Sequence, residues 1–219
     1  MNKQQQATEA IIQQGMLPLY FHHDASVCVD VLKTLYSNGI RTIEFTNRGK
    51  EALDNFKELL KERNQNMPDM LLGVGTIKNV ADAKVFVEAG ADYVISPGFS
   101  AEVAAYVHQQ ELLYIPGTAS ATEVMTAENA GCHFVKIFPG NVLGPAFMSG
   151  IKEIFPDLNF MPTGGVDIDT ENIKSWFKAG VKAVGLGSKL VSKSIMDNKD
   201  YDTLAKLTQK AIVIVNKVR

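Results

Sequence analysis

Residues 129–137 read NAGCHFVKI, and the same pattern recurs at 37–45 (SNGIRTIEF), 88–96 (EAGADYVIS) and 178–186 (KAGVKAVGL). In each copy a glycine follows a stretch with helical periodicity, and a β-rich run begins a few residues later. Glycine in that position ends a helix in the left-handed conformation without steric cost. The recurrence therefore indicates a repeated strand–helix unit.

Short runs with strand character occur along the whole chain, at residues 17–21, 42–46, 71–75, 93–96, 112–115, 134–138, 159–162 and 183–186. Helical stretches lie between them, and this alternation predicts an α/β fold with a parallel sheet and right-handed crossovers. Eight similar units predict a TIM-type (β/α)8 barrel, preceded by a short N-terminal helix near residues 8–14. An open, doubly wound sheet is the alternative. Because no linker divides the chain, residues 1–219 are expected to form a single barrel domain.

The composition excludes several classes of protein. Of 219 residues, 46% are hydrophobic and 21% are charged, and the net charge is −2. These values are ordinary for a soluble globular protein, and without a basic excess no nucleic-acid partner is expected. No apolar run approaches the roughly 18 residues of a membrane-spanning helix, so no membrane association is expected. The two cysteines and the absence of a secretory signal predict a cytoplasmic location with reduced thiols.

Lys136 is the most informative residue, because it lies inside the apolar run HFVKIFPG. Strand alternation places Phe134, Lys136 and Phe138 on one face. An apolar environment favours a neutral amine, which can attack a carbonyl carbon and form a Schiff base. The alternative is an ammonium group that reaches the barrel rim or joins a buried ion pair.

Glu44, in RTIEFTNR, lies in the middle of a strand and is expected to point into the barrel toward Lys136. Its carboxylate is a candidate general acid/base, although it could merely neutralise Lys136 or Arg48. Arg48 follows the same strand and carries a planar guanidinium suited to a carboxylate or phosphate, unless it is simply solvated. Thr76, in GVGTIKN, adds a hydroxyl after the third strand.

Two glycine-rich phrases, PTGGVD (162–167) and GLGSKL (185–190), follow the seventh and eighth predicted strands. The loops after these strands commonly bind phosphate in barrels, through backbone N–H groups. Gly164, Gly165, Gly187 and Ser188 are therefore candidates for a phosphate site. The alternative is tight turns with nothing bound.

The remaining polar residues indicate no metal or cofactor chemistry. No spacing of histidine, cysteine or carboxylate residues resembles a set of metal ligands, so no metal site and no cofactor are expected. His22 and His23 could contribute to a site, whereas His133 begins a strand and lies at the wrong end for catalysis. Ser96 and Ser120 have no evident His/Asp companions, so a hydrolytic triad is not supported.

Taken in order, the motifs IEFTNR, GVGT, ISPGF, IPGTASATE, VKIFPG, PTGGV and GLGS resemble a known family over roughly residues 17–190. The family is the class I aldolases for 2-keto-3-deoxy-6-phosphogluconate (KDPG) and 4-hydroxy-2-oxoglutarate. The resemblance implies that Lys136 is the Schiff-base lysine and Glu44 the acid/base. It also implies that Arg48 and Thr76 meet the substrate carboxylate.

The same resemblance assigns the rest of the pocket. Pro97 and Phe138 match residues of its wall, and Thr163 matches a position tied to the sugar hydroxyls. Gly164, Gly165 and Ser188 match the phosphate end. The chain departs from the family after the first strand, where many members carry an arginine and this sequence reads YFHHD.

The implied function is cleavage of a 2-keto-3-deoxy sugar acid, KDPG first among them, to pyruvate and glyceraldehyde 3-phosphate. The implied enzyme is metal-free and homotrimeric and belongs to Entner–Doudoroff carbohydrate metabolism. Related substrates remain alternatives: 4-hydroxy-2-oxoglutarate, a phosphogalactonate derivative or an unphosphorylated sugar acid. A phosphate-binding barrel isomerase or epimerase would use the same glycine-rich loops without an imine. A non-catalytic binder of sugar acids is the third class.

Overall fold

The computed structural model describes residues 2–219 and contains two parallel sheets. One sheet has the order β5-β4-β3-β2-β1-β9 and the other has the order β6-β7-β8. The strands are β1 Met16–Tyr20, β2 Thr42–Thr46, β3 Leu71–Gly75, β4 Tyr93–Ile95, β5 Leu113–Ile115, β6 Gly117–Thr118, β7 Phe134–Ile137, β8 Asn159–Pro162 and β9 Val184–Leu186. The predicted α/β architecture with parallel strands is thus confirmed.

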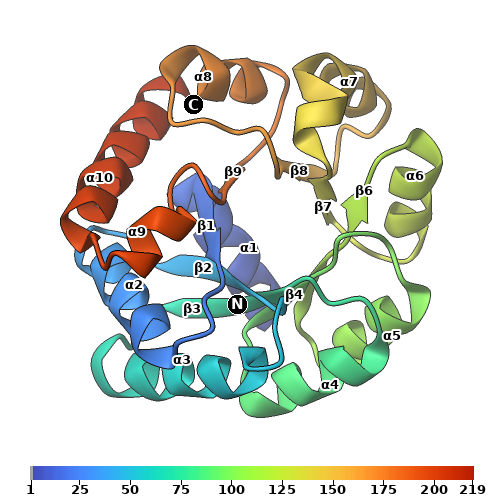
Figure 1. Cartoon of the computed structure of the whole chain (residues 1–219). Coiled ribbons are helices and arrows are strands. Elements are labelled where there is room, and N and C mark those ends of the chain that lie inside the picture. The colour runs from blue at the N-terminus through green and yellow to red at the C-terminus, as the bar shows by residue number, and fades with distance from the viewer. Residues whose placement is uncertain (1) are drawn as a thin grey trace.

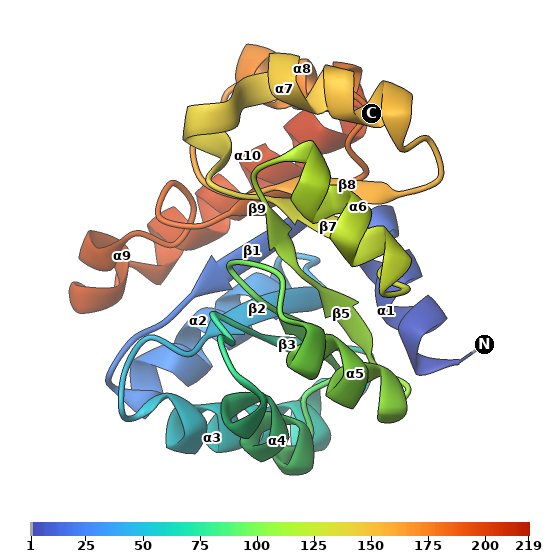
Figure 2. The ribbon, with the colours of Figure 1, turned by 90° about the vertical axis from the view of Figure 1, so that its right-hand side faces the viewer.

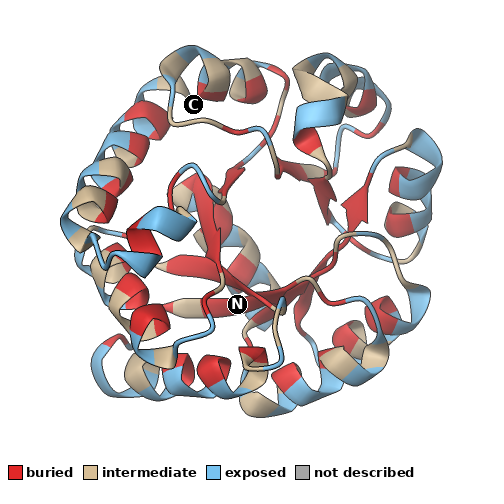
Figure 3. Ribbon diagram, in the orientation of Figure 1, coloured by how far each residue is buried: buried red, intermediate tan, exposed pale blue. Residues whose placement is uncertain are grey.

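The helices form a ring around the strands (Figure 1), and their buried residues face inward (Figure 3). They are α1 Lys3–Gln14, α2 Ala25–Ser37, α3 Ala52–Asn66, α4 Val80–Ala89, α5 Ala101–Gln109, α6 Ala121–Asn129, α7 Gly140–Ile154, α8 Thr170–Lys178, α9 Lys193–Asp197 and α10 Tyr201–Val218. The glycines of the repeated phrase have left-handed φ angles of 95° to 117° at Gly39, Gly90 and Gly180, and 81° at Gly131. The predicted helix ends are therefore confirmed.

The two sheets come together at both of their edges. Thr163 and Gly185 form a parallel bridge, and the Lys182 N–H donates to the Phe160 carbonyl at 2.9 Å. At the other edge only Pro116 separates β5 from β6. Proline has no N–H to donate to a neighbouring strand, so the ladder is interrupted there. The strand predicted at residues 112–115 is confirmed as β5, and the short strand β6 beyond Pro116 was not predicted.

Alternation along the strands separates an outer from an inner layer. Ile43 and Phe45 belong to the large apolar cluster that packs against the helices. A second cluster contains inward-facing strand residues, among them Tyr93 and Phe134, together with Ile11 of α1. Figure 2 shows α1 at one end of the strands and α9 at the other. The interior is therefore apolar at the end that α1 covers, and polar strand residues must lie nearer the other end.

Helix α1 begins earlier than the predicted residues 8–14, and its start has a clear physical cause. The Asn2 side chain accepts from the Gln5 N–H at 2.8 Å, and the Gln5 side chain accepts from the Asn2 N–H at 3.2 Å. This reciprocal capping box stabilises the first turn.

Tyr93 fills the interior because Gly73 leaves room for it. Its hydroxyl donates to the Ile43 carbonyl at 2.6 Å and is hydrogen-bonded to the Thr42 hydroxyl at 2.8 Å. Burial raises the pKa of Tyr93 well above its usual value. A Cβ at position 73 would lie 1.9 Å from the Tyr93 ring. Gly73 is thus a packing glycine.

We expect Gly73→Ala to lower the free energy of unfolding by about 1–3 kcal/mol, because the added methyl group overpacks the interior against Tyr93. Gly98→Ala is the matched control, since no atom lies within 4 Å of a Cβ built at position 98. Urea denaturation of both variants measures the difference. Equal stability of the two variants would contradict this account of the interior.

Candidate active site

Lys136 and Glu44 face each other across the interior, one from each sheet. Lys136 lies on β7 and Glu44 on β2, and the Lys136 Nζ is 3.7 Å from the Glu44 Oε1. The two side chains are 5% and 1% exposed. Strand alternation sets both directions, because the neighbours Val135 and Ile43 point outward into the large apolar cluster.

The surroundings leave the Glu44 carboxylate open to further partners. Neither of its oxygens has a hydrogen-bond partner within the described residues 2–219. Gly75 makes room for it, because a Cβ there would lie 1.8 Å from the Glu44 Oε1. The Phe138 ring lies 5.1 Å from the Lys136 Nζ, within range of a cation–π interaction. A buried carboxylate without hydrogen bonds is costly, and such groups concentrate at functional sites.

Thr76 and Pro97 lie at the carboxyl ends of the strands next in line. Thr76 follows β3 directly and has a left-handed φ of 61°. For a β-branched residue this conformation is an outlier that carries strain, and strained residues cluster at active sites. Pro97 follows β4 and is half-buried. Both residues belong to the same end of the sheet as the bridge between Thr163 and Gly185.

A cavity of about 220 Å³ opens beside the lysine–glutamate pair. Most of the other predicted site residues line it, namely Arg48, Phe138, Thr163, Gly164, Gly165, Gly187 and Ser188. The lining does not include Lys136, Glu44, Thr76 or Pro97. Phe138 connects the two regions, since its ring faces the Lys136 ammonium and also lines the cavity.

Thr163 contributes a buried hydroxyl to this cavity. Its Oγ1 has no hydrogen-bond partner within the part of the chain that the structure describes. A Cβ at Gly185 would lie 2.4 Å from that oxygen, so the first glycine of GLGS exists to admit Thr163. The three atoms nearest to a Cβ built at Gly187 all belong to Leu19, at 3.6–3.9 Å, so that position is not crowded.

The site combines a buried amine, a carboxylate without hydrogen bonds and an adjoining cavity with glycine-rich walls. A family model described as KDPG and KHG aldolase matches residues 8–207. The chain belongs to this aldolase family.

Individual relatives agree with the family assignment. The chain is 32% identical over 209 residues to the 2-dehydro-3-deoxy-phosphogluconate aldolase of Treponema pallidum, covering 94% of this chain and 96% of that protein. It is 29% identical to the KHG/KDPG aldolase of Escherichia coli K12, covering 94% and 95% of the two chains. A crystal structure of KDPG aldolase from Legionella pneumophila, with pyruvate captured as a covalent carbinolamine intermediate, superposes with a TM-score of 0.83. That match has 26% identity and covers 92% of this chain and 97% of that chain.

Sequence reasoning about this aldolase-family chain missed Lys189 at the cavity and Asp167, its ion-pair partner. Lys189 lines the cavity, and the Lys189 Nζ lies 3.0 Å from the Asp167 Oδ1. A lysine in a loop is usually solvated, so nothing in the pattern GLGSKL singled it out. Its position directly after Ser188 was the available signal.

The histidines and possible metal ligands lie elsewhere. His22 is buried, and its Nε2 lies 3.3 Å from the Asp197 Oδ1. This contact ties the loop after β1 to α9.

Within residues 2–219, no group of three or more His, Cys, Asp or Glu side chains is arranged to hold a metal ion. No helix in the same range has the length and apolar character that a membrane crossing requires.

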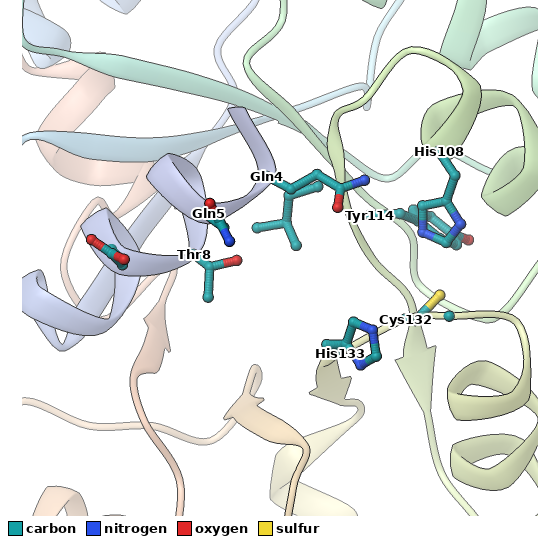
Figure 4. A pocket seen from close by; sticks show the side chains of 10 residues that line it. Gln4, Gln5, Thr8, His108, Tyr114, Cys132 and His133 are labelled. Carbon is teal, nitrogen blue, oxygen red and sulfur yellow. The ribbon is translucent and has the colours of Figure 1, made fainter. Parts of the chain in front are cut away.

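A second cavity of about 220 Å³ lies between α1 and the segments that precede β5 and β7 (Figure 4). Gln4 and Thr8 of α1 face His108, Cys132 and His133 across it. It holds no lysine and lies at the end of the strands opposite to the cavity beside Lys136. Burial, and secondarily the nearby His133, lower the pKa of His108 below its usual value.

This lowered pKa predicts a loss of stability in mild acid. The folded state binds the His108 proton less readily than the unfolded chain, so falling pH favours unfolding through about pH 6.5, the usual histidine value. We expect the melting temperature to fall less between pH 7.5 and pH 5.5 in His108→Gln than in the unmodified chain. Differential scanning fluorimetry across this pH range measures the effect. An identical pH profile for both proteins would contradict it.

Proposed function

We propose that this protein is a class I aldolase that cleaves KDPG to pyruvate and glyceraldehyde 3-phosphate through a Schiff base on Lys136. The observation that carries the proposal is the buried Lys136 facing Glu44, whose carboxylate accepts no hydrogen bond within residues 2–219, in a chain of the KDPG and KHG aldolase family. The carbinolamine in the Legionella pneumophila structure supports the same chemistry.

In the proposed mechanism the neutral Lys136 amine attacks the C2 ketone and forms a carbinolamine. Loss of water then leaves a protonated imine, which acts as an electron sink. Glu44, directly or through one water, removes the proton from the C4 hydroxyl, and the C3–C4 bond breaks. The aldehyde leaves, the resulting enamine takes a proton at C3, and hydrolysis releases pyruvate and the free lysine.

The other site residues hold the substrate in this proposal. Arg48 and Thr76 orient the substrate carboxylate so that C2 faces Lys136. Orientation of this kind can lower the activation free energy by roughly several kcal/mol. Pro97 and Phe138 form the apolar wall beside the imine. Thr163 meets a sugar hydroxyl with its unpartnered Oγ1. Because Thr163 lies in the cavity wall, the substrate chain is expected to extend from Lys136 into that cavity.

The phosphate end of the substrate is assigned to the glycine-rich loops. Gly164, Gly165, Gly187 and Ser188 line the cavity together. Gly164 and Gly165 have left-handed φ angles of 89° and 73°, a backbone conformation that favours glycine. Backbone N–H groups in such loops are suited to phosphate oxygens.

The proposal also includes the architecture and setting expected from the sequence. Residues 1–219 form one domain, a closed (β/α)8 barrel, which the bridge between Thr163 and Gly185 supports. The enzyme is proposed to be a cytoplasmic homotrimer. Both cysteines are free and buried, which suits a reducing compartment, and exposed apolar residues such as Val142 and Ile154 on α7 suit an oligomer.

Two alternatives have separate predictions. The dual KHG/KDPG name of the Escherichia coli relative favours 4-hydroxy-2-oxoglutarate as a second substrate of the same site. A phosphate-binding isomerase would use the glycine-rich loops but would form no imine. Borohydride trapping distinguishes the isomerase from any aldolase of this class.

Incubation with pyruvate and borohydride is expected to add one pyruvyl group, and peptide mapping is expected to place it on Lys136. Lys136→Ala should lose both the adduct and the cleavage of KDPG, because the amine is the nucleophile. Lys84→Ala, which changes an exposed lysine on α4, is the control and should keep both. A folded protein that forms no adduct would overturn the aldolase proposal and favour the isomerase.

Glu44→Gln is expected to lower kcat for KDPG cleavage by about 10²–10⁴, since general acid/base catalysis contributes factors of that size. Imine trapping with pyruvate should persist, because pyruvate has no C4 hydroxyl to deprotonate. Steady-state kinetics and intact mass measure the two effects. Loss of trapping in a folded variant would instead make Glu44 a structural partner of Lys136.

A further inference from the structure

The charges at the cavity beside Lys136 are unequal. Its lining contains two cationic side chains, Arg48 and Lys189, and no carboxylate. The loop that follows β1 reads Phe21, His22, His23 and Asp24, so it adds no lysine or arginine. An anionic ligand in this cavity therefore has two cations available within its walls.

The two cations come from different strands. Arg48 follows β2, the strand that carries Glu44, and the proposed mechanism assigns it to the carboxylate at the reacting end. Lys189 follows β9, directly after Gly187 and Ser188, the residues assigned to the phosphate end. A phosphate monoester carries a charge of about −1.5 to −2 at neutral pH. Backbone N–H groups and a serine hydroxyl are neutral, and Arg48 is assigned to the carboxylate, so Lys189 is the remaining cation of the lining that can balance the phosphate charge.

Lys189 already has an anionic partner in the absence of phosphate. Its Nζ lies 3.0 Å from the Asp167 Oδ1, and the two side chains are 63% and 46% exposed. The Asp167 Oδ1 is buried but accepts no hydrogen bond within residues 2–219. Because the two side chains are largely exposed and no hydrogen bond joins them, the ion pair is weak and exchanging one anion for another has a small cost. Asp167 follows Gly164 and Gly165, and Lys189 follows Gly187. The ion pair between Asp167 and Lys189 therefore connects the two glycine-rich loops.

We propose that Lys189 is the residue that selects substrates with a phosphorylated distal end, by exchanging Asp167 for the phosphate. Asp167 acts as a positioning residue that holds the ammonium at the cavity when phosphate is absent. This inference rests on the proposed aldolase function. It adds a specificity determinant from the loop after β9, outside the lysine–glutamate chemistry.

The test compares two substrates that differ only in the phosphate: KDPG and its unphosphorylated counterpart, 2-dehydro-3-deoxygluconate. Lys189→Gln should raise KM for KDPG about tenfold with little change in kcat, because a charge-assisted hydrogen bond is lost from binding alone. KM for the unphosphorylated acid should stay unchanged. Pyruvate trapping on Lys136 should also remain complete, which shows that the reacting end is intact.

Lys193→Gln is the matched control, since Lys193 is an exposed lysine on the nearby helix α9 that does not line the cavity. It removes the same net charge and should leave both KM values unchanged. A Lys189→Gln variant that affects both substrates equally, or neither, would overturn the role of Lys189 while the aldolase function stands. Absence of cleavage and of pyruvate trapping in the unmodified protein would instead overturn the aldolase proposal itself.

Discussion

A lysine amino group and a glutamate carboxylate that face each other at 3.7 Å between two sheets must do without most of their hydration. Such a pair is tolerated only where neighbouring groups leave space for it and the fold compensates the desolvation elsewhere. Here the space comes from Gly75, which yields its side-chain volume to Glu44. The compensation comes from an extensive apolar layer between the strands and the helix ring.

The strand interior is therefore graded along its length. At the end covered by α1 it is filled by apolar and aromatic residues, including Tyr93 and Phe134, with Ile11 of α1 packed against them. Lys136 is the next inward-facing residue of β7 after Phe134. Phe138, directly after β7, is the one that follows. Since each inward residue is two positions from the next, β7 and the residue after it place an apolar ring, a buried lysine and a ring that lines the cavity in sequence.

Glycines on the strands leave space for inward-facing side chains of the neighbouring strands. Gly73 admits Tyr93, Gly75 admits Glu44, and Gly185 admits Thr163. Each of these glycines lies on the strand next to the residue that it accommodates. The same small residue thus has one role in the sheet and a different role in the loops, where Gly164 and Gly165 take left-handed conformations beside the cavity.

The sequence by itself determined the repeat of strands and helices, the ends of the helices, and the inward direction of Lys136 and Glu44. These features depend on local periodicity and on the conformational freedom of glycine, which a single chain displays directly. The family assignment also came from the sequence, because its motifs occur in order along most of the chain.

Only the tertiary structure decided which residues meet. The lack of hydrogen bonds at Glu44, its ion pair with Lys136 and the pairing of Lys189 with Asp167 all involve segments distant in sequence. Local pattern does not record the distance between two loops or the volume left beside a side chain. Those quantities are set when the strands close on one another, because packing then fixes which side chains share the space between them.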